Sequence, residues 1–194
     1  MHRPWHNRLM SGSPTTSPPA ERAAARPAAP PTGAPTGSGA AERLRSQWDR
    51  LSGLPGGKRL FSWLVGRMAP YTGTIGARVE ELGPGRARAT MRDRRKVRNH
   101  LRSVHAIAQI NLAEIVSGLA VMYSMPAGLR GIPVHLEIDY VKKARGTVTA
   151  LCDLDRPIPE PRGDERVSFE APVVLTDPAG DVVSRAKARW MIGR

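Results

Sequence analysis

The chain has 194 residues, the length of one domain or of one domain with appendages. Lysine and arginine number 30 against 17 aspartates and glutamates, and the resulting net charge of +13 favours anionic partners without identifying them. The single cysteine, Cys152, excludes an intramolecular disulfide and a cysteine-based zinc cluster and suits a reducing compartment. We therefore expect a cytoplasmic protein with no metal and no cofactor.

Residues 1–40 differ in composition from the rest of the chain. They hold eight of the 18 prolines and four glycines, and most of the remainder is alanine, serine and threonine. Such a stretch cannot bury enough apolar surface to offset the entropy of ordering it, so we predict a disordered tail over residues 1–40. Its four arginines and its single acidic residue, Glu21, would also fit an organelle transit peptide, which stays open as an alternative.

Two accessory helices are predicted over residues 41–69. Apolar residues recur at helical spacing in residues 41–51 and 58–68, and the segment Leu54-Pro55-Gly56-Gly57 interrupts the pattern between them. Within the second helix, one apolar stripe should follow the spacing i, i+3, i+4 and i+7 at Leu60, Trp63, Leu64 and Arg67.

Residues 70–194 are predicted to form one α+β domain. Alternating apolar residues indicate strands over residues 74–82, 86–92, 132–140, 147–153, 167–176 and 181–192. The clearest is 132–140, where polar residues and a proline separate Ile132, Val134, Leu136, Ile138 and Tyr140. A 19-residue apolar run over residues 107–125 precedes that strand. One helix among six strands predicts an antiparallel sheet around a single central helix rather than repeated βαβ units.

The apolar run is more typical of a helix buried in protein than of a membrane span, because it contains Gln109, Asn111, Glu114, Ser117 and Ser124. We therefore expect no membrane partner.

Glu114 is the most informative residue in the chain. It lies at the middle of the predicted buried helix, where an isolated carboxylate must pair with a partner or raise its pKa. Asn111 and Ser117 lie three residues to either side and Gly118 four residues on, so one stripe of the helix is polar or bare and could form the floor of a site. A structural glutamate paired with an arginine across a subunit contact, or with a backbone amide, is the alternative.

The segment leading into this helix resembles a known enzyme family. Asn99, His105 and Glu114 follow one another at spacings of six and nine residues, as in the hotdog-fold acyl-coenzyme A thioesterases of the phenylacetic-acid-pathway type. The segments 113–120 and 140–146 are also similar to that family, although Ala106-Ile107 stand where it usually has Gly-Gly. The resemblance covers about residues 70–192 and implies a hotdog fold, a curved antiparallel sheet wrapped around one long helix.

The resemblance implies hydrolysis of acyl-coenzyme A thioesters without a metal. Glu114 would activate a water molecule, Asn99 would orient the water or the substrate, and the Ala106 amide would bind the oxyanion at the positive end of the helix dipole. We expect His105 to fix the start of the helix by a side-chain hydrogen bond, and a direct part in the catalysis is the alternative for this residue. Implied substrate-binding residues are Asn111, Ser117, Lys142, Lys143 and Arg145. A homodimer or a dimer of dimers is also implied, with Asn99 and Glu114 of one site on different subunits.

Three other functions are weighed. The pair Ala106-Ile107 favours a catalytically silent protein that binds acyl groups or acyl-coenzyme A. A hotdog hydratase or dehydratase would use His100 and Glu114, which are fourteen residues apart, but the Phe-Pro-Gly segment of those enzymes is missing. Eight cations in residues 86–102 suggest nucleic-acid binding, yet no aromatic side chain lies among them to stack on bases, so no nucleic-acid partner is expected.

Overall fold

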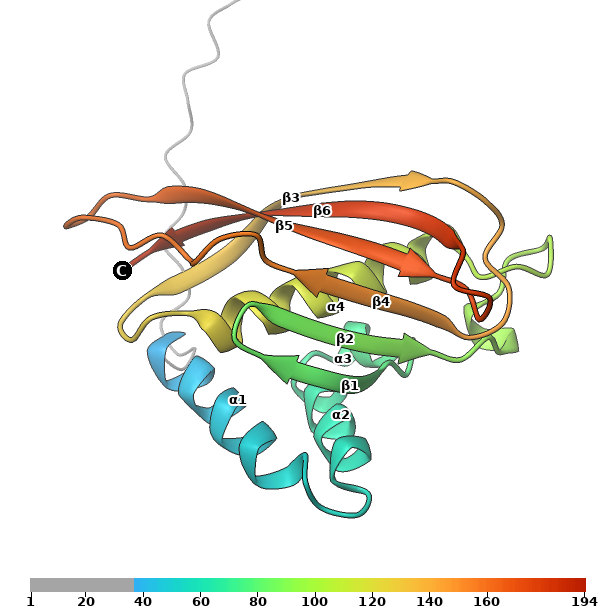
Figure 1. Ribbon diagram of the computed structural model, residues 1–194, viewed down its shortest axis with the longest axis horizontal. Coiled ribbons are helices and arrows are strands. Elements are labelled where there is room, and N and C mark those ends of the chain that lie inside the picture. Colours follow the sequence, from blue (N-terminus) through green and yellow to red (C-terminus); the bar gives the residue numbers. More distant parts are fainter. Residues whose placement is uncertain (1–36) are drawn as a thin grey trace, which may run out of the picture. The chain divides into compact units, whose positions relative to one another are not determined.

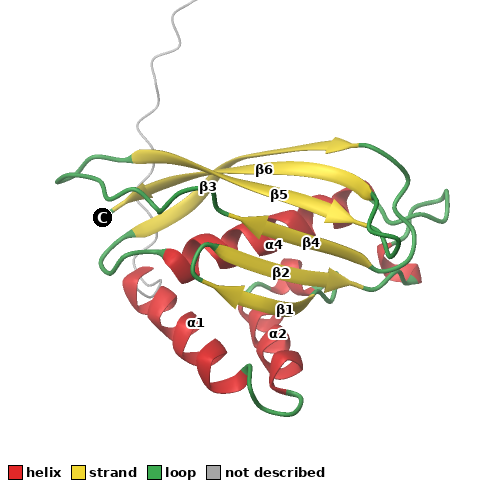
Figure 2. Ribbon diagram, in the orientation of Figure 1, coloured by secondary structure: helices red, strands yellow, loops and turns green. Residues whose placement is uncertain are grey.

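The computed structural model describes residues 37–194. The predicted disordered tail lies outside the described residues, apart from residues 37–40, which form the first turn of a helix. Figure 2 shows the helices of the described part on one side of a six-stranded sheet.

Three helices precede the sheet: α1 (Gly37–Leu51), α2 (Gly57–Met68) and the one-turn α3 (Pro70–Gly73). The predicted helices over residues 41–51 and 58–68 are confirmed, and the first begins four residues earlier than expected. The rings of Trp48 and Phe61 meet edge to face, with centroids 5.0 Å apart, and so join α1 to α2.

The predicted apolar stripe of α2 is wrong. Phe61 is fully buried, and the packed face of α2 follows the spacing i, i+4 and i+8 through Gly57, Phe61 and Val65. Leu60 and Trp63 are instead 47% and 60% exposed. Burial of the Phe61 ring fixes the rotation of the helix, and a residue two positions on points about 200° away from it.

The sheet has the strand order β1-β2-β4-β5-β6-β3, and every neighbouring pair is antiparallel. Its strands are β1 (Arg78–Gly83), β2 (Arg86–Met91), β3 (Arg130–Tyr140), β4 (Val148–Asp153), β5 (Val167–Thr176) and β6 (Val182–Gly193). The predicted antiparallel sheet with a single long helix is confirmed. β1 begins four residues later than predicted, because residues 74–77 connect it to α3.

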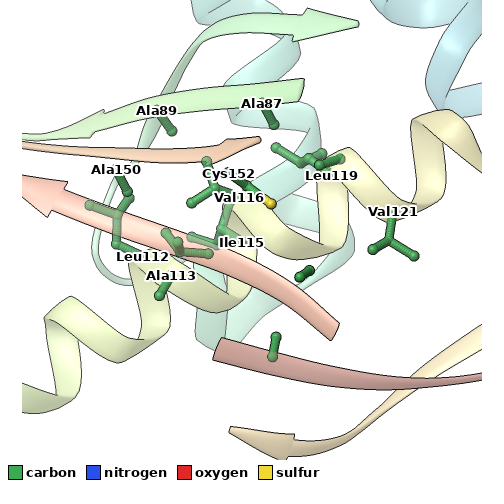
Figure 3. Close-up of a cluster of buried hydrophobic side chains, with 14 of the residues drawn as sticks. Ala87, Ala89, Leu112, Ala113, Ile115, Val116, Leu119, Val121, Ala150 and Cys152 are labelled. Carbon is green, nitrogen blue, oxygen red and sulfur yellow. The ribbon is translucent and has the colours of Figure 1, made fainter. Parts of the chain in front are cut away.

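The long helix α4 (Ala106–Ser124) packs along the sheet and contacts every strand (Figure 1). In Figure 3, Leu112 and Val116 of α4 lie among the small residues Ala87 and Ala89 of β2 and Ala150 of β4. By length and composition α4 could cross a membrane, but most of it is buried in this structure. It is therefore the core helix of the fold.

β3 is an edge strand, and a bulge changes which of its side chains face the helices. Leu136 and Ile138 pair with buried alanines of β6 and so lie on the helix side of the sheet. The register shifts just after Pro133, which itself pairs with the buried Trp190, so Ile132 lies on the opposite face. The predicted unbroken alternation over residues 132–140 is therefore wrong at its start.

The opposite face of the sheet carries paired charges. Arg86 and Arg88 contact Glu81, and Arg189 contacts Glu170 at 3.2 Å. Much of the basic charge on the strands is thus neutralised locally and solvated, which does not favour a nucleic-acid surface there.

Candidate active site

The start of α4 is set by a histidine cap. His105 has an extended backbone, and its Nδ1 accepts a hydrogen bond from the Ile107 N–H at 3.1 Å. The prediction that His105 fixes the helix start is therefore confirmed. Nδ1 is therefore the acceptor nitrogen of the ring in this cap.

Two other N–H groups of the first turn remain free. The amides of Ala106 and Ala108 donate to no acceptor within residues 37–194, as helix geometry allows for the first turn. The Ala106 carbonyl accepts a hydrogen bond from the Tyr140 hydroxyl at 3.0 Å, which ties this end of α4 to β3. Free donors at the positive end of a helix suit an anion or a developing oxyanion.

Asn99 holds the loop that leads into the cap. Its Oδ1 accepts hydrogen bonds from the Leu101 N–H at 3.0 Å, the Ser103 N–H at 3.2 Å and the Ser103 hydroxyl at 3.1 Å. Arg102, within the same loop, has a left-handed backbone with φ of 55°. The oxygen of Asn99 therefore organises this loop, whereas the family resemblance implied that Asn99 orients the water or the substrate.

Glu114 lies on the one stripe of α4 that is not buried. The stripe contains Ile107, Ile110, Glu114, Gly118 and Met122. Within residues 37–194, the Glu114 carboxylate has neither an ion pair nor a hydrogen bond, so it has no structural partner among these residues. Partial burial raises the pKa of Glu114 above its ordinary value.

Gly118 keeps this stripe bare next to Glu114. A Cβ atom at Gly118 would meet the Trp190 ring at 3.5 Å, so α4 and β6 approach closely there.

The other two polar residues of the predicted site differ in position. Asn111 and His105 line a cavity of about 540 Å³ between α3, the segment 96–98 and the start of α4. Ser117 is fully buried, and its hydroxyl donates to the Glu114 backbone carbonyl at 3.0 Å. Asn111 thus lies at a cavity, whereas the Ser117 hydroxyl is satisfied by a carbonyl of its own helix.

The three cations predicted to bind the substrate, Lys142, Lys143 and Arg145, differ in whether a carboxylate neutralises them. Lys142 is clamped by Asp177 at 2.8 Å and Asp181 at 2.6 Å, whereas Lys143 and Arg145 are exposed with no carboxylate within 4.0 Å among the described residues. Lys96 and Arg98 line the 540 Å³ cavity, and Arg98 contacts Asp93 at 2.6 Å. Lys96 was not singled out from the sequence, because a run of eight cations does not indicate which of them borders a cavity.

Nucleophilic cysteine chemistry has no support in the structure. Cys152 is fully buried on β4, and burial raises the pKa of its thiol to about 12. Within the described part of the chain, no three His, Cys, Asp or Glu side chains are grouped so that they could hold a metal ion.

The family described as "Domain of unknown function (DUF4442)" matches residues 57–192. A structural-genomics protein, APC5556, is 32% identical with a TM-score of 0.68, over 78% of this chain and 98% of that chain. A search of the curated proteins found no match.

Two further structures are less similar in sequence. PA5026 from Pseudomonas aeruginosa, named a probable thioesterase, is 22% identical with a TM-score of 0.60, over 72% of this chain and 96% of that chain. Thioesterase HI1161 from Haemophilus influenzae is 14% identical with a TM-score of 0.56, over 66% and 87%. At these identities the similarity shows a common fold.

Proposed function

The chain belongs to the DUF4442 family and has the hotdog fold of the acyl-coenzyme A thioesterase superfamily, and on this premise we propose that it hydrolyses acyl-coenzyme A thioesters. The observation that carries the proposal is that the Glu114 carboxylate, on the partly exposed stripe of the core helix, has no partner among the described residues. A partly buried, unpaired carboxylate is costly to keep, and catalysis is the role that this position supports best.

Glu114 acts as the general base. It removes a proton from a water molecule as the water oxygen attacks the thioester carbonyl carbon, and the carbon–sulfur bond then breaks. The thiolate of coenzyme A leaves and takes up a proton, so the products are a carboxylic acid and free coenzyme A. The raised pKa makes Glu114 a stronger base than an exposed glutamate while leaving it ionised at sufficiently high pH.

The carbonyl oxygen requires donors as it becomes negatively charged. The free N–H groups of Ala106 and Ala108 lie at the start of α4, where the helix dipole adds to their effect. These two amides are the oxyanion donors of the proposed site.

These two parts of the site are too far apart to serve one substrate within a single protomer. Eight residues separate Ala106 from Glu114, which is about 12 Å along the helix axis. A scissile carbonyl must lie about 3 Å from both the oxyanion donors and the attacking water. We therefore place the start of α4 from one subunit beside Glu114 of a second copy.

A surface for such a dimer is present at the β3 edge. Leu136 and Tyr140 are 38% and 46% exposed on the helix side of this unpaired edge, and Ile107 on α4 is 52% exposed beside them. An exposed apolar edge strand is a template for pairing with another strand. Association of two β3 edges about a two-fold axis would cover this surface and bring each Glu114 towards the other subunit.

Leu136→Glu should separate the subunits. A charge placed in the apolar contact would be buried without a partner and should raise the dimer dissociation constant at least about 100-fold. Analytical ultracentrifugation measures this shift, and hydrolysis measured on the same samples should fall with the dimer fraction. The matched control Leu54→Glu changes an exposed leucine in the α1–α2 turn and should leave both unchanged. A fully active monomer would contradict the composite site.

The phosphates of coenzyme A are assigned to the cations around the start of α4. Lys96, Asn111 and His105 line the same cavity. Arg145 is exposed on the loop next to this cavity. The Asp93 carboxylate holds that loop by accepting a hydrogen bond from the Gly146 N–H at 3.0 Å. Lys142 is excluded from this group because two aspartates already neutralise it.

Replacing both Lys96 and Arg145 by glutamine should raise KM for acyl-coenzyme A about tenfold with little change in kcat, because charge-assisted phosphate contacts are lost. The KM for the corresponding N-acetylcysteamine thioester, which has no phosphate, should not change. The double control Arg43→Gln with Arg50→Gln removes the same charge from exposed positions on α1. Equal effects on both substrates would remove these cations from phosphate binding.

The direct test of the function is release of free thiol from a panel of acyl-coenzyme A esters by the purified full chain. A catalytically silent acyl-coenzyme A binder is the second candidate, favoured by the exposed Ile107 side chain in the cavity at the start of α4. That candidate requires saturable binding of the esters with no thiol release above the rate without protein.

A further inference from the structure

A second cavity lies away from Glu114 at the other edge of the sheet. It measures about 650 Å³ and is formed by α2, the α3–β1 segment, β1 and a single residue of α4, Ile115. The lining of this cavity includes none of Glu114, Asn111 and His105. The cavity borders β1, and the proposed dimer contact borders β3, which is the opposite edge of the sheet. The proposed dimer site therefore does not account for this cavity.

The second cavity is positively charged. Arg59 and Arg67 of α2 and Arg78 of β1 line it, and no acidic residue does. Within residues 37–194, Arg59 and Arg67 have no carboxylate within 4.0 Å. The Arg78 Nε is itself paired with a Glu80 carboxylate oxygen at 3.1 Å, so the unpaired guanidinium groups at the cavity are those of Arg59 and Arg67. Guanidinium donors left free around a cavity select an anionic group, and a carboxylate or phosphate fits their planar geometry.

The same cavity has apolar walls. Arg59, Trp63 and Arg67 follow the spacing i, i+4 and i+8, so one face of α2 presents an indole between two cations over about 12 Å. The Trp63 side chain is 60% exposed, and Val65 and Ile115 lie at the cavity as well. An apolar chain laid along this face would cover surface that is otherwise in water.

From these features we propose that the second cavity binds a fatty-acid carboxylate, with its head group on an arginine and its alkyl chain along Trp63. Its volume falls within the roughly 300–1,000 Å³ of typical ligand sites. The anionic head and the apolar chain follow from the lining residues alone. A fatty acid is also the product released by the proposed hydrolysis, so the cavity offers a place for product separate from Glu114; only that link rests on the proposed function.

The test uses sodium dodecanoate below its micelle concentration, titrated into the purified full chain by calorimetry. Saturable binding is expected, and Arg59→Gln combined with Arg67→Gln should weaken it at least about tenfold, the effect of losing a charge-assisted hydrogen bond. Trp63→Ala should weaken it independently. The control pair Arg43→Gln and Arg50→Gln should bind as the wild type does.

Three comparisons identify the ligand chemistry. Dodecanol lacks the charge and acetate lacks the chain, so both should bind much more weakly than dodecanoate. Equal binding of dodecanol, or an unchanged dissociation constant in the Arg59 and Arg67 variant, would overturn the proposal. The proposal would also be overturned if the protein sedimented with phosphatidylglycerol vesicles but did not bind free dodecanoate. The surface would then bind a bilayer and not a single fatty acid.

Binding and hydrolysis are read separately in these experiments. Glu114→Gln should keep the arginine-dependent dodecanoate binding while losing hydrolysis. Binding lost with hydrolysis intact would refute only the second cavity, and hydrolysis absent with binding intact would refute only the proposed reaction.

Discussion

Replacing Glu114 by glutamine should lower kcat for acyl-coenzyme A hydrolysis by on the order of 10²–10⁴-fold, the usual contribution of a general base. Glutamine keeps the size and polarity of the side chain but cannot accept the proton of the attacking water. For the wild type, kcat/KM should rise with pH and then level off, because the base must be ionised. Burial raises the pKa of Glu114, so this rise should lie above the ordinary range of a glutamate.

The stability of the same variant separates a catalytic role from a structural one. A glutamate whose pKa is raised in the folded state binds more protons folded than unfolded, so its contribution to stability falls as pH increases through that range. At neutral pH, Glu114→Gln should therefore melt no lower than the wild type. A variant that melts well below the wild type would indicate that Glu114 has a structural partner in the assembled protein.

Replacing Ala106 by proline should lower kcat by about 10²–10³-fold, the cost of removing one oxyanion donor. Proline lacks the N–H group but is favoured at the first position of a helix, which Ala106 occupies. The preceding residue, His105, already has the extended backbone that proline requires, with φ of −63° and ψ of 142°. The change therefore removes a single donor with little disturbance of α4.

Ala106→Gly is the matched control, because glycine keeps the N–H group at the same position. It should retain most of the activity, and circular dichroism should show equal helix content in both variants. If the proline variant hydrolyses substrate as fast as the glycine variant, the Ala106 amide does not bind the oxyanion.

The arrangement of strands and the central helix was predictable because hydrophobic period and turn residues are local signals. The rotation of α2 was not, since the spacing of Leu60, Trp63 and Leu64 is as helical as that of Gly57, Phe61 and Val65. Which face packs depends on Trp48, a partner on another helix. The β3 bulge is likewise set by its pairing with β6 and leaves little trace in the strand itself.

The candidate site was predictable at its centre and less so around it. Gln109, Asn111, Glu114 and Ser117 look alike from the sequence, as polar residues in an apolar helix. Packing separates them: Gln109 is held by Ser184 and the Val104 carbonyl, and Ser117 by its own helix, while Glu114 is left unpaired. The pairing of Lys142 with Asp177 and Asp181 depends on loops that meet only in the fold.

The most direct measurement of the central claim, a site shared between two subunits, is complementation between two inactive variants. Ala106→Pro and Glu114→Gln chains are unfolded together, refolded as a mixture, and assayed for acyl-coenzyme A hydrolysis. In a mixed dimer, the intact Ala106 of one chain faces the intact Glu114 of the other at one of the two sites.

Random pairing makes half of the dimers mixed, so about a quarter of the wild-type activity should return if sites are shared between subunits. If each site lay within one subunit, every site in the mixture would carry one of the two changes. Activity no higher than that of the separate variants would then contradict the account.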